Sequence, residues 1–93
     1  MTFDDFRKDH AVKKEQIDTI ERDNLYRDDG RVPHVPFGFG NKKWLKFKQQ
    51  MLPGDEIYHF NSSAESWRNL AGREGYVLVR GVEVVDEFVT TLN

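Results

Sequence analysis

The sequence contains no cysteine, and none of its apolar runs approaches the ~20 residues that a membrane-spanning helix needs. The lack of cysteine excludes disulfide bonds and thiolate-bound metal ions. The N-terminus is charged from Asp4 onward and lacks the apolar region of a signal peptide. We therefore expect a soluble, cytoplasmic protein that does not enter a membrane.

Hydrophobic residues are also scarce, at 38% of the 93 residues, whereas charged residues reach 32%. A chain of this length suits one domain, which buries only a little over half of the surface that its unfolded chain exposes. Aromatic residues, at 13%, partly compensate, because each buried ring removes roughly 150–250 Å² from water. The composition therefore predicts a compact core in one part of the chain and a well-solvated remainder.

Charge is unevenly distributed, although its net value is only −2. Residues 53–93 carry seven acids and three arginines, whereas residues 32–52 carry no acid and four lysines: Lys42, Lys43, Lys46 and Lys48. A basic helix beside an acidic sheet could attract a partner, or the two could attract one another. We favour the internal attraction. Nucleic-acid binding by the Lys42–Lys48 helix ranks third among the functional hypotheses, because the molecule as a whole is acidic.

Residues 1–30 predict a charged N-terminal helix. A helix is expected around residues 4–24, and helical spacing could place four apolar side chains at its start and along it on one stripe: Phe3, Phe6, Ile17 and Ile20. This stripe is thin and about half of residues 1–31 are charged, so we expect either a marginal helix or a partly mobile arm, which in both cases contributes little to the core. Asp28-Asp29-Gly30 is the predicted end of the helix, since glycine commonly follows a helix terminus.

Residues 31–41 form a predicted linker that contains two prolines and two glycines. Phe37 and Phe39 lie among the glycines, where aromatic side chains are unusual for a solvated linker. Two interpretations remain open. Either the two rings pin the loop onto the core, or they form a short exposed motif that a partner recognises.

Residues 42–93 predict an α+β core. The fold class that we predict is a small three-stranded antiparallel sheet packed by two short helices, with the N-terminal helix on or beside it. The expected elements are a helix at 42–52 capped by Asn41, strands at 56–60, 76–79 and 84–92, a helix at 63–71 capped by Ser62, and a turn at Gly81-Val82. The turn sets Arg80 opposite Glu83. Lys48 falls within the apolar arc of its helix and is expected to extend past a ring or to meet an acid of the sheet.

Several residues of the C-terminal part form a pattern: Gly54-Asp55-Glu56, Phe60, Ser66-Trp67, Leu70-Ala71-Gly72-Arg73, Gly75 and Leu78-Val79-Arg80. In this stretch of about 40 residues the chain resembles small bacterial proteins to which no function is assigned. The resemblance implies a shared fold and a bacterial origin. It implies no activity, cofactor or binding residue.

The candidate ligand-binding cluster consists of Trp67, Arg68, Arg73 and Tyr76. A pair of arginines beside aromatic rings could hold a carboxylate or phosphate. In the alternative interpretation, Trp67 fills the core and the arginines pair with Glu65, Glu74 or Asp86. His59 is expected to be a half-buried or edge residue rather than a general base.

No residues are assigned to catalysis, a cofactor or a metal, because the three histidines show no ligand spacing. The leading hypothesis is a non-catalytic binding or protein-interaction module whose partner is a protein, with a second copy of this chain included. A small enzyme, or an anion-binding protein that uses the Trp67 region, is the alternative.

Overall fold

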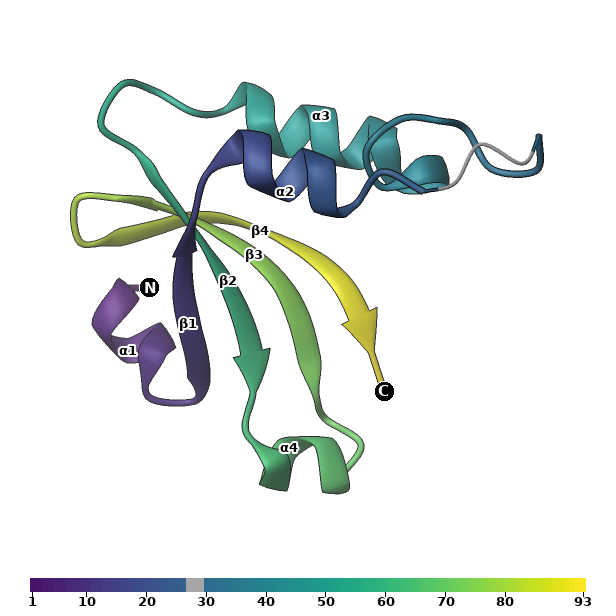
Figure 1. Ribbon diagram of the computed structural model, residues 1–93. Coiled ribbons are helices and arrows are strands. Elements are labelled where there is room, and N and C mark those ends of the chain that lie inside the picture. Colours follow the sequence, from purple (N-terminus) through teal and green to yellow (C-terminus); the bar gives the residue numbers. More distant parts are fainter. Residues whose placement is uncertain (27–29) are drawn as a thin grey trace.

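The computed structural model describes residues 1–26 and 30–93 and forms one four-stranded antiparallel sheet with helices at both of its faces (Figure 1). The strands lie in the order of the sequence: β1 (His10–Glu15), β2 (Glu56–Ser62), β3 (Arg73–Arg80) and β4 (Glu83–Leu92). The α+β class is confirmed, but the prediction of three strands is wrong.

Four α-helices and one short 3₁₀ helix accompany the sheet in the described residues. They are α1 (Phe3–Arg7), α2 (Ile17–Asp23), η1 (Gly38–Gly40), α3 (Asn41–Gln49) and α4 (Ala64–Arg68). In Figure 1, α2 and α3 lie side by side over one end of the sheet, and α4 connects β2 and β3 at the opposite end. No helix in the described residues is long and apolar enough to span a bilayer.

The missed strand lies inside the segment for which one helix was predicted. Helix α1 ends at Arg7, and the chain then pairs with β2 in an antiparallel register that sets Val12 opposite Phe60. The reason for the error is that β1 is an edge strand with alternating exposure and only one strongly apolar residue, so its own sequence carries little strand signal. Pairing with β2 supplies the stability that local propensity does not.

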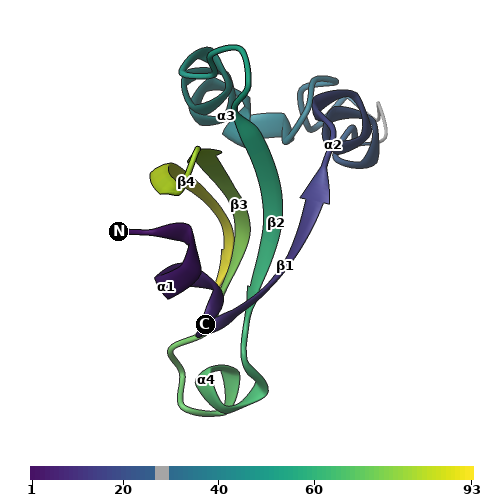
Figure 2. The same ribbon diagram turned by 90° about the vertical axis from the view of Figure 1, so that its left-hand side faces the viewer.

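The apolar stripe predicted for residues 4–24 is divided between the two faces of the sheet. Phe3 and Phe6 pack with Phe60 on one face, where α1 lies, whereas Ile20 packs with Trp44 on the other face beneath α2 and α3 (Figure 2). Strand β1 lies between these two helices in the chain, so the chain crosses from one face to the other. The residues predicted to form one helix therefore serve two separate clusters.

The sheet is covered on both faces because side chains alternate along each strand. One apolar cluster contains the buried residues Ile20, Phe37, Trp44, Phe47, Ile57, Leu78 and Phe88. The other contains Phe3, Phe6, Phe60, Val77 and Val79. Adjacent residues of β3 thus belong to opposite clusters, as the unbroken apolar run at 76–79 predicts for a central strand.

The cap of α4 lies one residue later than predicted. Ser63 Oγ accepts the backbone N–H of Ser66 at 3.2 Å, whereas Ser62 Oγ accepts the backbone N–H of Arg73 at 2.9 Å. The cause is that β2 continues to Ser62, two residues beyond the predicted strand, so Ser62 belongs to the sheet. Asn41 likewise opens α3 instead of capping it, and its side-chain amide donates to the carbonyl of Pro36.

The hairpin between β3 and β4 follows the sequence expectation in its register. Gly81 has a positive φ of 61°, and Arg80 lies opposite Glu83. The guanidinium of Arg80, however, makes two hydrogen bonds to the carboxylate of Asp55, at 2.9 and 2.8 Å. This donation from Arg80, together with the backbone N–H of Leu52, lowers the pKa of Asp55.

The predicted helix end at Asp28-Asp29-Gly30 lies largely outside the described residues, since Asp28 and Asp29 are not among them. Helix α2 ends earlier, at Asp23.

Of the two linker rings, Phe37 is buried among Trp44 and Phe88, whereas Phe39 is 78% exposed. The expectation that both rings pin the loop to the core is therefore correct only for Phe37.

Candidate functional site

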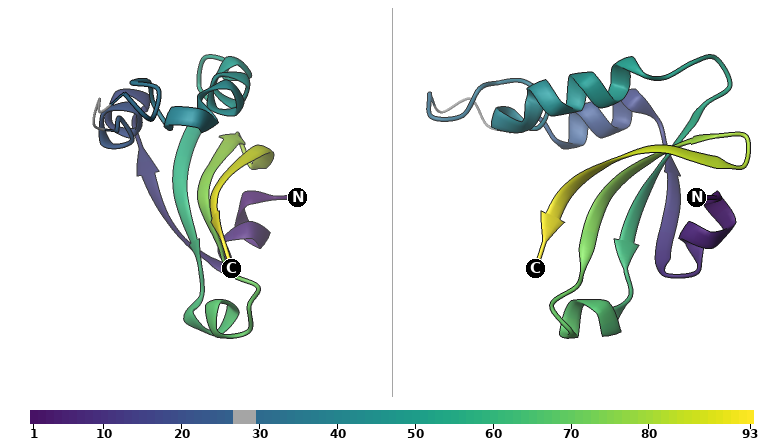
Figure 3. Two further views of the ribbon diagram at one scale, coloured as in Figure 1. Left: turned by 90° about the vertical axis from the view of Figure 1, so that its right-hand side faces the viewer. Right: turned by 180° about the vertical axis from the view of Figure 1, so that it is seen from behind.

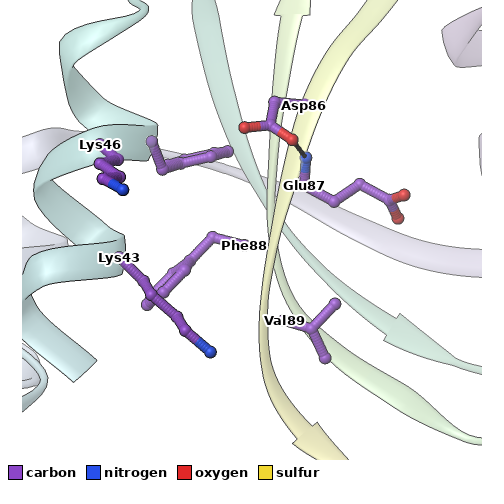
Figure 4. Close-up of a pocket in the computed structure, with 7 residues that line it drawn as sticks. Lys43, Lys46, Asp86, Glu87, Phe88 and Val89 are labelled. Atoms are coloured by element: carbon purple, nitrogen blue, oxygen red, sulfur yellow. Dashed lines mark hydrogen bonds between the residues drawn. The ribbon is translucent and has the colours of Figure 1, made fainter. Parts of the chain in front are cut away.

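A groove lies between α3 and the edge strand β4 (Figure 4). It consists of two adjoining cavities, one of about 400 Å³ and one of about 240 Å³, which share Lys43, Phe88 and Val89 as lining residues. The first cavity extends along β4 toward Asp86, and the second extends toward Gly40 and Tyr26. The groove therefore follows one edge of the sheet.

Aromatic side chains form the floor of the groove. Phe47 comes from α3 and Phe88 from β4, and their ring centroids are 5.9 Å apart. Both rings contact Trp44, which is fully buried beneath them. Because large rings packed in this way have few alternative positions, the floor is a preformed apolar surface.

The acidic side chains of the strand wall are already engaged. The carboxylate of Asp86 accepts the side-chain amide of Gln50 and, at 2.9 Å, the backbone N–H of Glu87. The carboxylate of Glu87 points away from the lysines in Figure 4 and pairs at 2.8 Å with Arg73 on the other face of the sheet. These two acids therefore do little to attract a cation into the groove.

The helix wall carries two cations without partners. Lys43 and Lys46 are exposed, and neither makes a hydrogen bond or an ion pair in the part of the chain that the structure describes. They are three positions apart on α3, so they project from the same side of the helix. The open groove is thus apolar at its floor and positive at its rim.

Lys48 of the same helix behaves differently, because Glu21 of α2 neutralises it. Lys48 Nζ and the indole N–H of Trp44 both donate to Oε2 of Glu21, at 2.9 and 2.8 Å. Burial alone would raise the pKa of Glu21, but the two hydrogen bonds outweigh it and the pKa is lowered. The predicted acidic partner of Lys48 therefore exists, but it belongs to a helix and not to the sheet.

The backbone of β4 is open along most of its outer edge. The N-terminus covers only the start of the strand, where the N–H of Phe3 donates to Val82 and the N–H of Val84 donates to Met1. In the described residues, no strand pairs with the outer side of β4 beyond this point. An exposed strand edge beside an apolar groove is a template for pairing with another chain.

The structure does not bring the predicted cluster of Trp67, Arg68, Arg73 and Tyr76 together. Arg73 lies on the α1 face of the sheet, with its guanidinium 5.4 Å from the ring centroid of Phe60. Tyr76 belongs to the opposite face, where its hydroxyl accepts the side-chain amide of Asn24 at 3.2 Å. Burial raises the pKa of the Tyr76 hydroxyl. Arg73 pairs with an acid, as the alternative interpretation expects, but the acid is Glu87 and not one of the expected Glu65, Glu74 or Asp86.

Trp67 lies at the α4 end of the sheet and is half-buried. Its indole N–H donates to Oδ1 of Asn61 at 2.7 Å, and its ring packs so closely on Gly72 that a Cβ there would lie 2.2 Å away. Arg68 is exposed and directs no hydrogen bond to another described residue. Trp67 therefore holds the β2–β3 connection in place, and no arginine or lysine of the described residues makes a cation–π contact with its ring.

His59 pairs with an acid on the neighbouring strand. Its Nε2 lies 2.9 Å from Oε2 of Glu74, and its ring contacts that of Tyr76 edge-on, with the centroids 5.5 Å apart. It lines neither cavity of the groove. Among the described residues, no group of three histidines, cysteines or acids is placed to hold a metal ion.

The sequence places Lys43 and Lys46 in a basic helix at 42–52 but does not connect them with β4. The missing information was the order of the strands, which makes β4 an edge and places it beside α3. Phe88 and Val89 give no separate signal, because apolar residues in a strand are ordinary core candidates. The groove could therefore be found only after folding.

The chain matches no protein-family model, no curated protein and no solved structure. The resemblance of residues 54–93 to small bacterial proteins stays a prediction, and function has to be argued from the groove itself.

Proposed function

We propose that this protein is a non-catalytic protein-interaction module that binds an extended segment of a partner along the outer edge of β4. The single observation that supports this proposal is the open backbone of β4 beside a groove with an aromatic floor. In strand addition, main-chain hydrogen bonds provide affinity and pockets for alternate side chains provide specificity. A cytoplasmic location, which the cysteine-free composition favours, is part of the same proposal.

The outward-pointing backbone groups can be identified from one hydrogen bond. The N–H of Glu87 donates to the side chain of Asp86 at 2.9 Å, and from this bond we infer that it points away from β3. Alternate residues of a strand direct their N–H groups to the same side, so the N–H of Val89 also points outward. Proline is tolerated in an edge strand where the N–H faces solvent. Val89→Pro should therefore block strand addition and leave the pairing with β3 intact.

The test is a selection of binders from a library of random ten-residue peptides, with the full-length protein as bait. We expect the selected peptides to shift amide NMR signals of β4 and α3, and we expect Val89→Pro to abolish binding. Val89→Thr is the matched control, because it removes a methyl contact but keeps the N–H. Amide shifts confined to other parts of the sheet, or full binding by the proline variant, would contradict the proposal.

A second copy of the chain is one form of the same interaction. Sedimentation experiments on the wild type would then show a dimer, and Val89→Pro would show a monomer. A dimer that persists in the proline variant would mean that the chain associates through a different surface.

A further inference from the structure

We infer that the segment bound beside β4 is acidic, with carboxylates at two alternating positions that meet Lys43 and Lys46. This inference rests on the proposed function and concerns the chemistry of the partner at the same site. Charge complementarity supports it, because the rim of the groove carries two exposed ammonium groups that have no partner among the described residues.

The contrast with neighbouring charges makes this feature specific. On the strand wall, Glu87 is paired with Arg73, and Asp86 accepts hydrogen bonds from Gln50 and from the Glu87 backbone. On the helix, Lys48 is paired with Glu21. The charges around the groove are therefore satisfied internally, except for those that line its helix wall. A partner that adds carboxylates there loses no existing ion pair of this protein.

The spacing of a strand matches this pair of lysines. Residues i and i+2 of an extended segment project to the same face and lie roughly 7 Å apart. Lys43 and Lys46 lie about 5–6 Å apart at Cβ, one turn from each other on α3. Their long, flexible side chains cover the small difference, so two acids at i and i+2 can each reach one ammonium group.

The remainder of the groove favours one large apolar side chain beside the acids. Beyond Lys43 the groove continues into the second cavity, where Tyr26, Phe37 and Phe88 provide apolar lining. A side chain two positions further along the bound segment projects to the same face and reaches this cavity. The expected partner segment therefore has acids at positions i and i+2. A large apolar residue lies two positions before the first acid or two positions after the second.

The experiment compares three synthetic nine-residue peptides that differ only at the two alternating positions. One carries glutamate, one glutamine and one lysine there, each with phenylalanine two positions away and threonine elsewhere. Two exposed ion pairs correspond to a preference of about two- to thirty-fold for the glutamate peptide over the glutamine peptide. This preference should shrink when salt is raised from 0.05 to 0.5 M, because the charges are exposed.

Charge reversal on the protein sharpens the comparison. The double variant Lys43→Glu/Lys46→Glu should lose the preference for the glutamate peptide and bind the lysine peptide more tightly than the wild type does. Lys42→Glu is the matched control: Lys42 is an exposed lysine of the same helix that lines neither cavity. It should leave the preference unchanged. An equal effect of Lys42→Glu would refute the inference, since it would mean that only the overall charge matters.

Failure of this inference and failure of the proposed function give different results. If all three peptides bind equally, and Val89→Pro abolishes binding, strand addition stands and the acidic preference is refuted. If none of the three binds, both are refuted. A single-stranded oligonucleotide that displaces the glutamate peptide, with a steep dependence on salt, would refute the acidic segment in favour of a nucleic acid.

Discussion

Glu21 determines which lysines of α3 are available to a partner. Its carboxylate accepts both the indole N–H of the buried Trp44 and the ammonium group of Lys48. A buried indole N–H without an acceptor would be costly, so this bond serves the core as well as the charge balance. By taking up Lys48, Glu21 leaves the positive rim of the groove to Lys43 and Lys46.

The lowered pKa of Glu21 predicts an acid-sensitive contribution to stability. Because the pKa is lower in the folded protein, this contribution is complete above the ordinary glutamate pKa of about 4.3 and is lost as the pH falls through the lowered value. Glu21→Gln should reduce the free energy of unfolding by about 1–2 kcal/mol at neutral pH. The deficit should shrink toward zero as the pH falls through the lowered pKa. Urea unfolding at neutral and at acid pH measures it.

The control for this variant is Asp9→Asn, because Asp9 is exposed and its side chain makes no hydrogen bond or ion pair with another described residue. It should change the free energy of unfolding by less than about 0.5 kcal/mol. A deficit of Glu21→Gln that is equally large at acid and neutral pH would show that the shape of the side chain matters and its charge does not.

At the scale of the elements, close approach of β4 to β3 positions the wall of the groove. Gly75 of β3 is buried at an irregularity of the register, opposite Val89. A Cβ at Gly75 would lie 2.1 Å from the carbonyl oxygen of Phe88 and 2.9 Å from Cα of Val89. Both of these atoms belong to the backbone and cannot rotate away. Only glycine therefore lets β4 lie where it forms the groove.

We predict that Gly75→Ala reduces the free energy of unfolding by about 1–3 kcal/mol, the usual cost of overpacking. It should also weaken peptide binding, because β4 has to move. Thermal unfolding together with the peptide titration measures both effects. Gly40→Ala is the control for stability, since Gly40 has no positive φ and the nearest atom to its Cβ would be 3.6 Å away. Unchanged stability of Gly75→Ala would mean that the strands separate at little cost.

At the scale of the whole molecule, the N-terminal segment joins the two faces of the sheet. Phe3 and Phe6 belong to one apolar cluster, Ile20 belongs to the other, and β1 completes the sheet between them. Figure 3 shows α1 and α2 on opposite sides of the strands. The sequence-based expectation that this segment contributes little to the core is therefore wrong.

Deleting residues 1–24 should abolish cooperative unfolding. The deletion removes an edge strand, exposes the edge of β2 and takes buried aromatic or aliphatic side chains from both clusters. The loss of each large buried side chain costs about 2–5 kcal/mol, which together exceeds the usual stability of a small domain. Calorimetry of the chain 25–93 measures this. A sharp thermal transition in that fragment would show that the remaining three strands fold independently.

The sequence by itself determined the features that depend on neighbours in the chain. The glycine at position 81 fixes a tight turn and hence the Arg80–Glu83 register, and the apolar run at 76–79 requires a strand covered on both faces. Alternation and turn geometry are local properties, so they can be read before the chain folds. The α+β class follows from the same local signals.

Only the tertiary structure decided what depends on contacts between distant segments. Strand β1 forms because β2 pairs with it, although residues 10–15 alone favour no strand. The groove exists because β4 is the outermost strand beside α3. Its rim is positive because Glu21 binds Lys48, 27 residues away, whereas Lys43 and Lys46 have no partner among residues 1–26 and 30–93. Such contacts depend on which surfaces meet after burial of the core, and no local pattern specifies them.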